Sequence, residues 1–410
     1  MTKSKELRKS NTSLHIIIIV LAVIANSGYY LAVVNDSYIP LTLLIVATVY
    51  LIIKEKKKYL YFNKPYFFIL LIGIFLSSIY NFNYDNFLSG GRVVVTMICA
   101  FIIVQTLDMD LFLQCFCKII RISIYISVAF YFFIFINGNP NFPLIIRSTS
   151  YLPISYYNLI LLTQEVGGTR LSGWCWEPGV FSSIISFAMI YELYFKKDKI
   201  RISNLLVYIV AIFLTKSTAG IIILVGILVG FIWNKSGLNR YLITNIAFVI
   251  IVVTVIFSYE MIFEWLSTLN PEIFYKLTGT SQTTNTRIYG PLVNLRIFSK
   301  QPILGFGFTG AASQYYDYIT TNTGAMIVAQ TSTSTQILSS IGISGIMYTI
   351  GFIEPLWRKN FSFISFASKI VVASVFLLTI NKEPHVYIVI TWIIFFYLTN
   401  QQKEDKKIKS

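Results

Sequence analysis

The stretch KIIRISIYISVAFYFFIFI, residues 118–136, decides the fold class of this chain. Its two charges, Lys118 and Arg121, stand near its start, and its other residues are apolar or weakly polar. A helix of this length crosses the hydrocarbon core of a bilayer, which is about 30 Å thick. Hydrophobic residues make up 55% of the chain and charged residues only 12%, which excludes an ordinary soluble domain. The composition predicts an integral membrane protein.

Similar apolar runs lie on both sides of this stretch. Together with it they are placed near residues 13–34, 38–53, 65–80, 89–107, 118–136, 178–195, 202–215, 218–233, 241–257, 336–353, 362–380 and 386–399. We therefore expect an all-α polytopic membrane protein with about 12 transmembrane helices. We expect these helices to form a single integral membrane domain over residues 1–410.

The basic residues predict which side of the membrane each loop occupies, because Lys and Arg are retained in cytoplasmic loops. With both termini in the cytoplasm, 24 of the 33 Lys and Arg residues fall on the inner side, while the 18 acidic residues divide equally between the two sides. The net charge of +15 then lies wholly on the cytoplasmic face. Membrane orientation accounts for this basic balance, so we expect membrane lipid, and no nucleic acid, among the partners.

Two outer segments are much longer than a turn, residues 137–177 and 258–335. In the first, the apolar patch Tyr156 to Leu162 predicts a short interfacial helix. In the second, Pro291 is suited to a first helical position and predicts a helix that starts there. Because function concentrates in loops held by packed elements, we expect these two segments to form the active-site region.

Arginine is frequent on the outer side, although the positive-inside tendency works against it. The outer arginines are Arg92, near the end of a span, and Arg147, Arg170, Arg287 and Arg296 in the two long segments. Each could pair with an outer glutamate. Several together indicate an anionic ligand, because a guanidinium binds phosphate oxygens bidentately. We interpret these arginines as candidate contacts for a lipid-linked phosphate or diphosphate.

Two shorter motifs add candidate residues. RLSGWCWEPG, residues 170–179, places Glu177 directly before Pro178, at the expected start of a span. This carboxylate is either a partner of the helix dipole or a general base. LTKSTAG, residues 214–220, places Lys216 at an outer turn. Its ammonium group either snorkels to water or binds an anionic head group.

GFGFTG, residues 305–310, is expected to form a turn and not a phosphate-binding loop, because no lysine follows it as in a Walker motif. His385, in the outer turn NKEPH, is either a plain exposed residue or a further substrate contact. The outer segments show no acidic pair spaced like a metal site, so we expect neither metal nor cofactor.

With these motifs the chain resembles the bacterial O-antigen polymerase and ligase superfamily, whose members are polytopic glycosyltransferases of the outer leaflet. The resemblance rests on the order of RLSGWCWEPG, LTKSTAG and TRIYGPLVNLRIFSKQPILGFGFTG, followed by a Ser/Thr-rich segment and QILSSIGISGIMYTIG, over about residues 165–355. It implies a GT-C-like fold in the cytoplasmic (inner) membrane with the active site facing the periplasm or the outside.

The resemblance also implies a reaction: a glycan carried on undecaprenyl diphosphate is transferred to a sugar hydroxyl of another lipid-linked repeat unit, without a metal. It assigns Arg170 and Arg287 to the diphosphate, and Arg296 occupies a less regular family position. Glu177 is the first candidate for the base and His385 a distant second. A polysaccharide chain-length regulator is an expected partner on the same ground.

Within the superfamily, ligases carry a His-Asn pair where this chain reads QTSTSTQ, residues 330–336. The difference favours a polymerase of O-antigen, capsular polysaccharide or exopolysaccharide over an O-antigen ligase. A flippase for lipid-linked oligosaccharide remains a third possibility. Flippases line a cavity with charges inside the spans, whereas the charges of this chain gather in the outer segments.

Overall fold

The computed structural model describes most of the predicted helices. The described residues are 15–24, 39–55, 65–137, 146–147, 155–157, 162–165, 168–196, 201–236, 243, 246, 282–323, 330, 332–358 and 361–400. The predicted span at 241–257 and a large part of the outer segment 258–335 therefore lie outside the described residues.

The described part of the chain is mainly helical, as predicted. Five helices in it are long and apolar enough to cross a membrane: Tyr84–Thr106, Met109–Ile136, Pro178–Phe195, Thr218–Lys235 and Thr333–Trp357. Six shorter apolar helices accompany them: His15–Ile24, Leu41–Ile53, Pro65–Tyr80, Ile202–Leu214, Phe366–Asn381 and Val389–Asn400. Each of these coincides with one of the apolar runs expected from the sequence, so the helical, membrane-type architecture is confirmed.

The chain forms two compact units. The first unit contains residues 1–64, 92–221 and 386–410, and the second contains residues 65–91 and 222–385. The first unit holds α3 (Ile39–Glu55), α6 (Met109–Asn137), α7 (Pro178–Ile190), α8 (Ile202–Leu214) and α18 (Val389–Asn400). The second holds α4 (Pro65–Tyr80), α13 (Gln282–Lys300), α14 (Phe308–Thr323), α15 (Thr333–Ile341), α16 (Ile346–Ile353) and α17 (Phe366–Asn381). Two helices, α5 (Tyr84–Thr106) and α9 (Thr218–Lys235), contribute to both units.

Two helices start earlier than hydropathy predicts. α5 begins at Tyr84 and α6 at Met109, whereas the apolar runs suggested starts near residues 89 and 118. The reason is N-terminal capping. The Asn83 side-chain oxygen accepts a hydrogen bond from the Asp85 amide (3.1 Å), and the Asp108 carboxylate accepts one from the Leu111 amide (3.1 Å). Such caps satisfy backbone donors before the apolar run begins.

The predicted interfacial helix around residues 156–162 is wrong. The segment before α7 instead contains four short antiparallel strands in the order β1, β2, β3, β4: Ile146–Arg147, Ser155–Tyr157, Leu162–Glu165 and Gly168–Leu171. The apolar patch is divided between β2 and β3, which pair with each other. Tyrosine and β-branched threonine suit a pleated strand better than a helix, and hairpin pairing satisfies the backbone groups.

The predicted helix start at Pro291 is also wrong, because α13 begins at Gln282 and contains Pro291 in its interior. A proline within a helix removes one backbone hydrogen bond. At this turn α14 approaches α13 closely: a Cβ on Gly290 would lie 2.6 Å from the Tyr315 hydroxyl. Nearby, Val293 and Ile297 pack against Tyr315 and Ile319.

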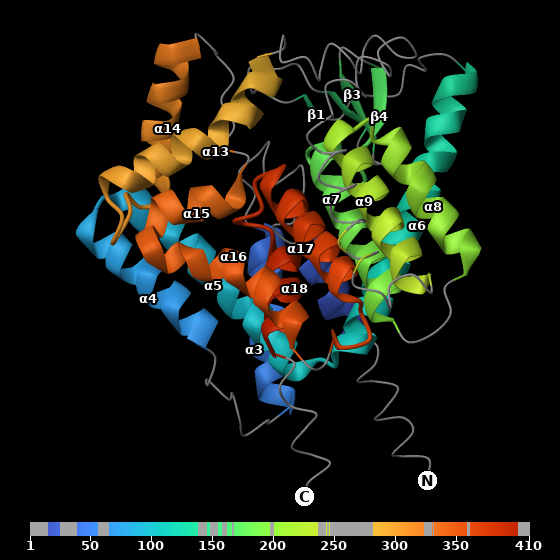
Figure 1. The fold of residues 1–410 in the computed structure, drawn as a ribbon, viewed down its shortest axis with the longest axis horizontal. Coiled ribbons are helices and arrows are strands. Elements are labelled where there is room, and N and C mark those ends of the chain that lie inside the picture. Colours follow the sequence, from blue (N-terminus) through green and yellow to red (C-terminus); the bar gives the residue numbers. More distant parts are fainter. Residues whose placement is uncertain are drawn as a thin grey trace, which may run out of the picture. The chain divides into compact units, whose positions relative to one another are not determined.

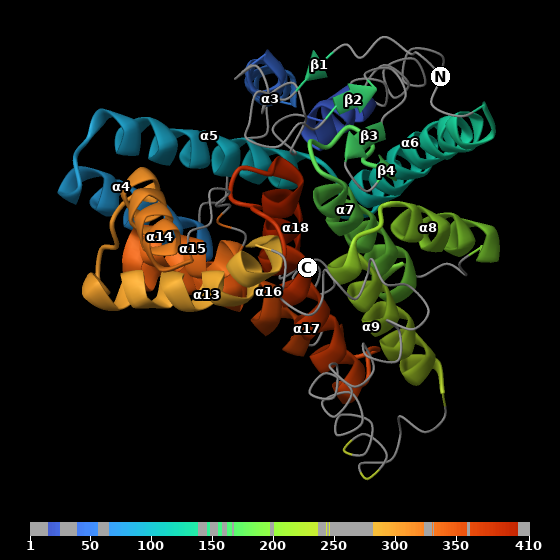
Figure 2. The same cartoon turned by 90° about the horizontal axis from the view of Figure 1, so that it is seen from above.

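The sequence GFGFTG forms a turn, as predicted. Gly305 and Gly307 have positive φ angles of 66° and 73°, which favour glycine. The Gly307 amide donates to the Ser340 carbonyl oxygen (2.8 Å) at the end of α15. On the other side, Asn86 accepts from the Thr309 and Gly310 amides, each at 2.9 Å, and so caps α14. The turn therefore has a structural role: it connects α13 to α14 (Figures 1 and 2) and is hydrogen-bonded to the end of α15, all within the second unit.

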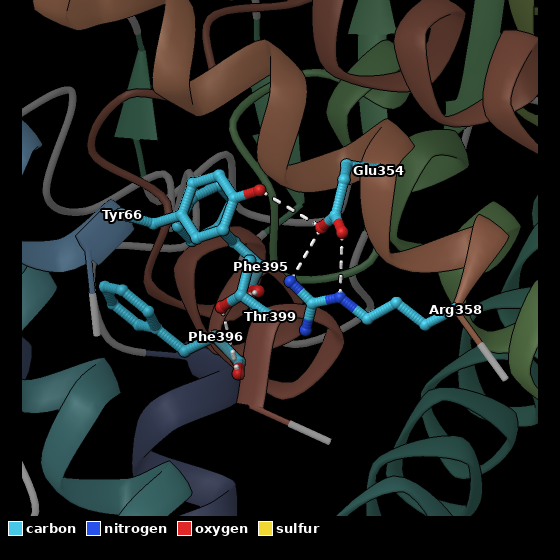
Figure 3. A network of polar contacts seen from close by, with 6 residues as sticks. All are labelled: Tyr66, Glu354, Arg358, Phe395, Phe396 and Thr399. Carbon is cyan, nitrogen blue, oxygen red and sulfur yellow. Dashed lines mark hydrogen bonds and ion pairs between the residues drawn. The ribbon is translucent and has the colours of Figure 1, made fainter. Parts of the chain in front are cut away.

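A polar network links the start of α4 to Glu354 and Arg358 in the second unit. Arg358 donates to both carboxylate oxygens of Glu354, at 3.0 and 2.6 Å, and the Tyr66 hydroxyl donates to Glu354 at 3.1 Å (Figure 3). In the first unit, the Thr399 hydroxyl bonds the Phe395 carbonyl oxygen within α18 (3.0 Å). These contacts stabilise helix ends, and none involves a predicted site residue.

Candidate functional site

Arg170 joins the two shorter motifs of the first unit. It lies in β4, where it is paired with Thr163 of β3, and its side chain is half-buried. Its Nε donates to the Thr215 carbonyl oxygen (2.9 Å), 45 residues away in sequence, and Nη2 lies 3.4 Å from the Lys216 carbonyl oxygen. Because β4 also contacts both α7 and α8, RLSGWCWEPG and LTKSTAG form one local structure.

Lys216 occupies the turn that Arg170 holds. It lies between α8 and α9 and has a positive φ of 49°, an uncommon conformation for a residue with a side chain. The turn is fixed further by Thr215 and Ser217: the Ser217 amide donates to the Thr215 hydroxyl (3.3 Å), and the Gly220 amide donates to the Ser217 hydroxyl (3.2 Å). Such a conformation persists only where the surroundings impose it, so the position of Lys216 is set by the fold.

Gly220 brings α9 close to α7. A Cβ at this position would lie 2.9 Å from the Ser182 hydroxyl oxygen, so the start of α9 and the first turns of α7 are in close contact. The LTKSTAG turn is therefore held by β4 through Arg170 and by α7 through Gly220.

Glu177 is the N-cap residue of α7, with extended backbone angles and Pro178 following it. Its carboxylate makes no side-chain capping hydrogen bond to α7. Its position at the start of the helix fits both predicted roles, partner of the helix dipole and general base. The segment before it is tightly packed: Gly173 has a positive φ of 54°, and a Cβ there would collide with the Phe181 ring. Glu177 is half-buried, and it is therefore fixed in position without being removed from solvent.

Cys175, in the same segment, is not a nucleophile. It is fully buried, and burial raises the pKa of its thiol well above the ordinary value. The reactive form is the thiolate, so this residue acts as a packing residue.

We name Arg170, Glu177 and Lys216 the Arg170 corner.

The first unit also contains the other two predicted residues, Arg92 and Arg147. The guanidinium of Arg92 lies over the Tyr387 ring, 4.7 Å from its centroid. Arg147 lies in β1, opposite Ser155 of β2. Across the sheet, the position of Arg147 is in register with Thr169, and not with Arg170. Since successive residues of a strand alternate between faces, Arg147 and Arg170 occupy opposite faces of the sheet.

In the second unit, Arg287 and Arg296 both belong to α13 but do not share a face. Nine residues correspond to about two and a half helical turns, which places the two positions on opposite sides. Arg296 is exposed, and it donates to the Tyr318 hydroxyl (2.8 Å) while lying 5.0 Å from the centre of that ring. Arg287 shares its side of the helix with Asn294, about two turns further on.

His385 lies between α17 and α18, as the sequence predicted, but it is not exposed. Its side chain is fully buried, and its backbone amide donates to the Thr333 hydroxyl (2.7 Å). Burial and the nearby charge of Lys382 lower its pKa to about 3. The imidazole is therefore neutral at physiological pH and adds no positive charge for a phosphate. The expectation of an exposed histidine failed because the turn is covered by the start of α15.

Hydropathy alone missed a buried ionic group in the first unit. Arg121 of α6 donates from Nη1 to a Glu192 carboxylate oxygen (2.5 Å) and to the Tyr208 hydroxyl (2.9 Å). Glu192 lies in a π-helical turn, Tyr191–Phe195, which continues α7. The sequence signal was a charge inside each of two apolar runs. Such residues are costly in a membrane and pair with one another.

A second missed feature lies at the start of α15. Neutral polar side chains from α13, from Gln330 and from the end of α17 surround its first turn. Asn294 donates to the Thr335 hydroxyl (3.0 Å) and accepts from Gln330 (2.6 Å), while Asn381 accepts from the Ser334 amide (2.8 Å). The available signal was the concentration of Ser, Thr and Gln in residues 330–336.

The structure thus brings Arg170 and the Lys216 turn together and places Arg287, Arg296 and His385 in the other unit. Comparison with models of known protein families finds no match, and comparison with curated proteins finds none either.

Proposed function

We propose that this protein is a polysaccharide repeat-unit polymerase of the cytoplasmic membrane. It transfers a growing glycan from undecaprenyl diphosphate to a sugar hydroxyl of another lipid-linked repeat unit at the outer leaflet. The observation that carries the proposal is the Arg170 corner: the Arg170 guanidinium binds the backbone of the turn that contains Lys216, and a carboxylate stands at the start of α7.

The chemistry of the reaction suits these residues. The bond between the anomeric carbon and the diphosphate oxygen breaks, and its electron pair leaves with the diphosphate. Permanent positive charge stabilises the charge that develops there, and this is the role that we assign to Arg170 and Lys216. Arg287, in the second unit, is the other arginine that the family resemblance assigns to the diphosphate.

The acceptor hydroxyl forms the new glycosidic bond and must lose its proton. Glu177 is our candidate for the base that takes this proton. It makes no capping hydrogen bond to α7 and is half-buried at a helix N-terminus. A positioned base contributes about 10²-fold to 10⁴-fold to such a step.

The remaining predicted contacts have smaller roles in this proposal. Arg92 and Arg296 each lie against a tyrosine ring. We therefore assign them to positioning the substrate, and not to stabilising the diphosphate leaving group. Arg147 remains a candidate contact for the glycan. His385 is a buried, neutral packing residue whose backbone is bonded to Thr333 of α15. The proposal includes the finer topology expected from the sequence: about 12 spans in a GT-C-like arrangement, both termini in the cytoplasm, and a chain-length regulator as partner.

Gene deletion tests the proposal against its two alternatives. Loss of a polymerase leaves single repeat units attached to their final acceptor, and we expect this result. Loss of a ligase leaves finished glycan on undecaprenyl diphosphate. Loss of a flippase leaves single repeat units on the lipid, facing the cytoplasm. Either of the last two patterns would contradict the assignment.

A further inference from the structure

The start of α15 is built from buried polar groups. α15 contacts both α13 and α17 in the second unit, and Figure 1 shows these helices side by side. Asn294 of α13 is fully buried, and both ends of its amide are used, by Thr335 and by Gln330. Ser332, the N-cap residue, makes no side-chain cap of its own, and the side chain of Asn381 takes that role.

Three polar atoms beside these bonds have no hydrogen-bond partner among the described residues: Gln330 Oε1, Ser334 Oγ and Gln336 Oε1. Ser334 is only 9% exposed and Gln336 only 8%. Buried polar groups in folded proteins are nearly always paired, because leaving them unpaired is unfavourable. Three such atoms in one short stretch therefore indicate that a partner from outside this set of residues completes the site.

The chemistry of these atoms selects the partner. Two of the three are amide carbonyl oxygens, which only accept hydrogen bonds, and the third is a hydroxyl, which both accepts and donates. A phosphate oxygen is itself an acceptor and cannot pair with a carbonyl oxygen. A sugar hydroxyl can donate to each of them. The two buried charges nearby, Lys382 and Glu383, have opposite signs, so they do not turn the site into an anion site.

The position of the site agrees with this chemistry. Arg287, which the proposed function assigns to the diphosphate, lies on the same side of α13 as Asn294, about 10 Å along the helix axis. A sugar attached to a diphosphate spans a comparable distance. We infer that the polar cluster at the start of α15, comprising Asn294, Gln330, Ser334, Gln336 and Asn381, binds a sugar of the lipid-linked substrate. This inference rests on the proposed function.

The test uses variants that remove the unpartnered oxygen atoms. Ser334→Ala and Gln336→Leu delete the Oγ and Oε1 atoms that have no hydrogen-bond partner among the described residues, so the fold should keep its thermal stability. Gln301→Leu is the matched control, since Gln301 Nε2, at the other end of α13, is also buried without a partner among the described residues. Binding to the purified full-length protein in nanodiscs is measured with two probes: undecaprenyl diphosphate, and the undecaprenyl-diphosphate-linked repeat unit extracted from a deletion strain.

We expect the wild type to bind the sugar-bearing lipid more tightly than undecaprenyl diphosphate. Ser334→Ala and Gln336→Leu should weaken binding of the sugar-bearing lipid about 5-fold to 20-fold each, without changing the affinity for undecaprenyl diphosphate, and Gln301→Leu should change neither. If the wild type binds both lipids equally, or if all three variants bind like the wild type, the sugar site is refuted while the proposed function stands, and the buried atoms bind water only. If the wild type binds neither lipid, both proposals fall.

Discussion

The Nε atom of Arg170 donates a hydrogen bond to the backbone carbonyl oxygen of Thr215, 2.9 Å away. This bond links β4 of the small sheet to the turn between α8 and α9. It also means that Arg170 has two roles in our account, as a cation and as a support for Lys216. Its substitution therefore has to be compared with one that removes charge without disturbing the turn.

Lys216→Asn provides that comparison. Asparagine tolerates the left-handed conformation that Lys216 adopts, so the turn should persist while one positive charge is lost. We expect polymer formation to fall about 10-fold to 100-fold, which corresponds to about 1.4 to 2.7 kcal/mol of lost transition-state stabilisation. The rate is measured with purified protein and lipid-linked repeat units.

Lys235→Asn, at the end of α9, is the control for this charge change and should be neutral. Equal activity of Lys216→Asn and the wild type would remove Lys216 from the site. Arg170→Lys, by contrast, should lower both activity and thermal stability, because a lysine cannot reproduce the planar donors of the guanidinium.

Glu177→Gln should separate binding from proton transfer. The amide keeps the size of the side chain, and α7 loses no capping hydrogen bond. If Glu177 takes the acceptor proton, kcat should fall at least about 100-fold, with little change in the KM of the acceptor. Initial rates over a range of acceptor concentrations give both quantities. A rise in KM at unchanged kcat would instead assign Glu177 to substrate binding.

Buried His385 predicts a loss of stability in acid. Its pKa is about 3 in the folded protein and is lowered from 6.5 by burial and by Lys382. The folded state therefore favours the neutral form, and its contribution to stability is complete above pH 6.5. The contribution is lost progressively as the pH falls from 6.5 toward 3, because the unfolded chain takes up the proton first. At pH 5 the loss should be about 2 kcal/mol.

The measurement for this prediction is the thermal midpoint in detergent between pH 7.5 and pH 5. The wild type should lose more stability over this range than His385→Gln, which cannot be protonated. Parallel pH profiles of the two proteins would show that the imidazole is not buried as described.

Gly342, directly after α15, makes a separate prediction about folding. It has a φ of 65°, and a Cβ there would collide with the Ile303 carbonyl oxygen. Gly342→Ala should therefore cost about 2 to 4 kcal/mol of stability. Gly91→Ala is the matched control, because a Cβ at that helical position meets nothing within 4 Å, and it should be neutral or slightly stabilising. Thermal midpoints that do not distinguish the two variants would exclude this tight contact.

The predictions from the sequence succeeded where one physical rule dominated. Apolar runs of membrane length form helices because the bilayer leaves few other structures possible, and the positions of the described helices agree with those runs. Local capping by Asn83 and Asp108 moved two helix starts. These caps were visible in the sequence but were outweighed by hydropathy.

The failures came from tertiary contacts that the sequence does not display. Pro291 lies inside α13, next to the close approach of α14 at Gly290. His385 is buried, and its backbone is bonded to Thr333 of α15. In the candidate site, the contact of Arg170 with the Lys216 turn joins two motifs that the sequence analysis singled out separately. The polar cluster at the start of α15 was not foreseen, since its partners come from three separate segments.

The central claim is that the protein itself joins lipid-linked repeat units. The most direct measurement places purified wild-type protein in vesicles with lipid-linked repeat units in the accessible leaflet and separates the products by size. Our account predicts a ladder of polymers on undecaprenyl diphosphate, much reduced for Lys216→Asn and normal for Lys235→Asn. Repeat units that remain monomeric with active wild-type protein, or that only change leaflet, would contradict it.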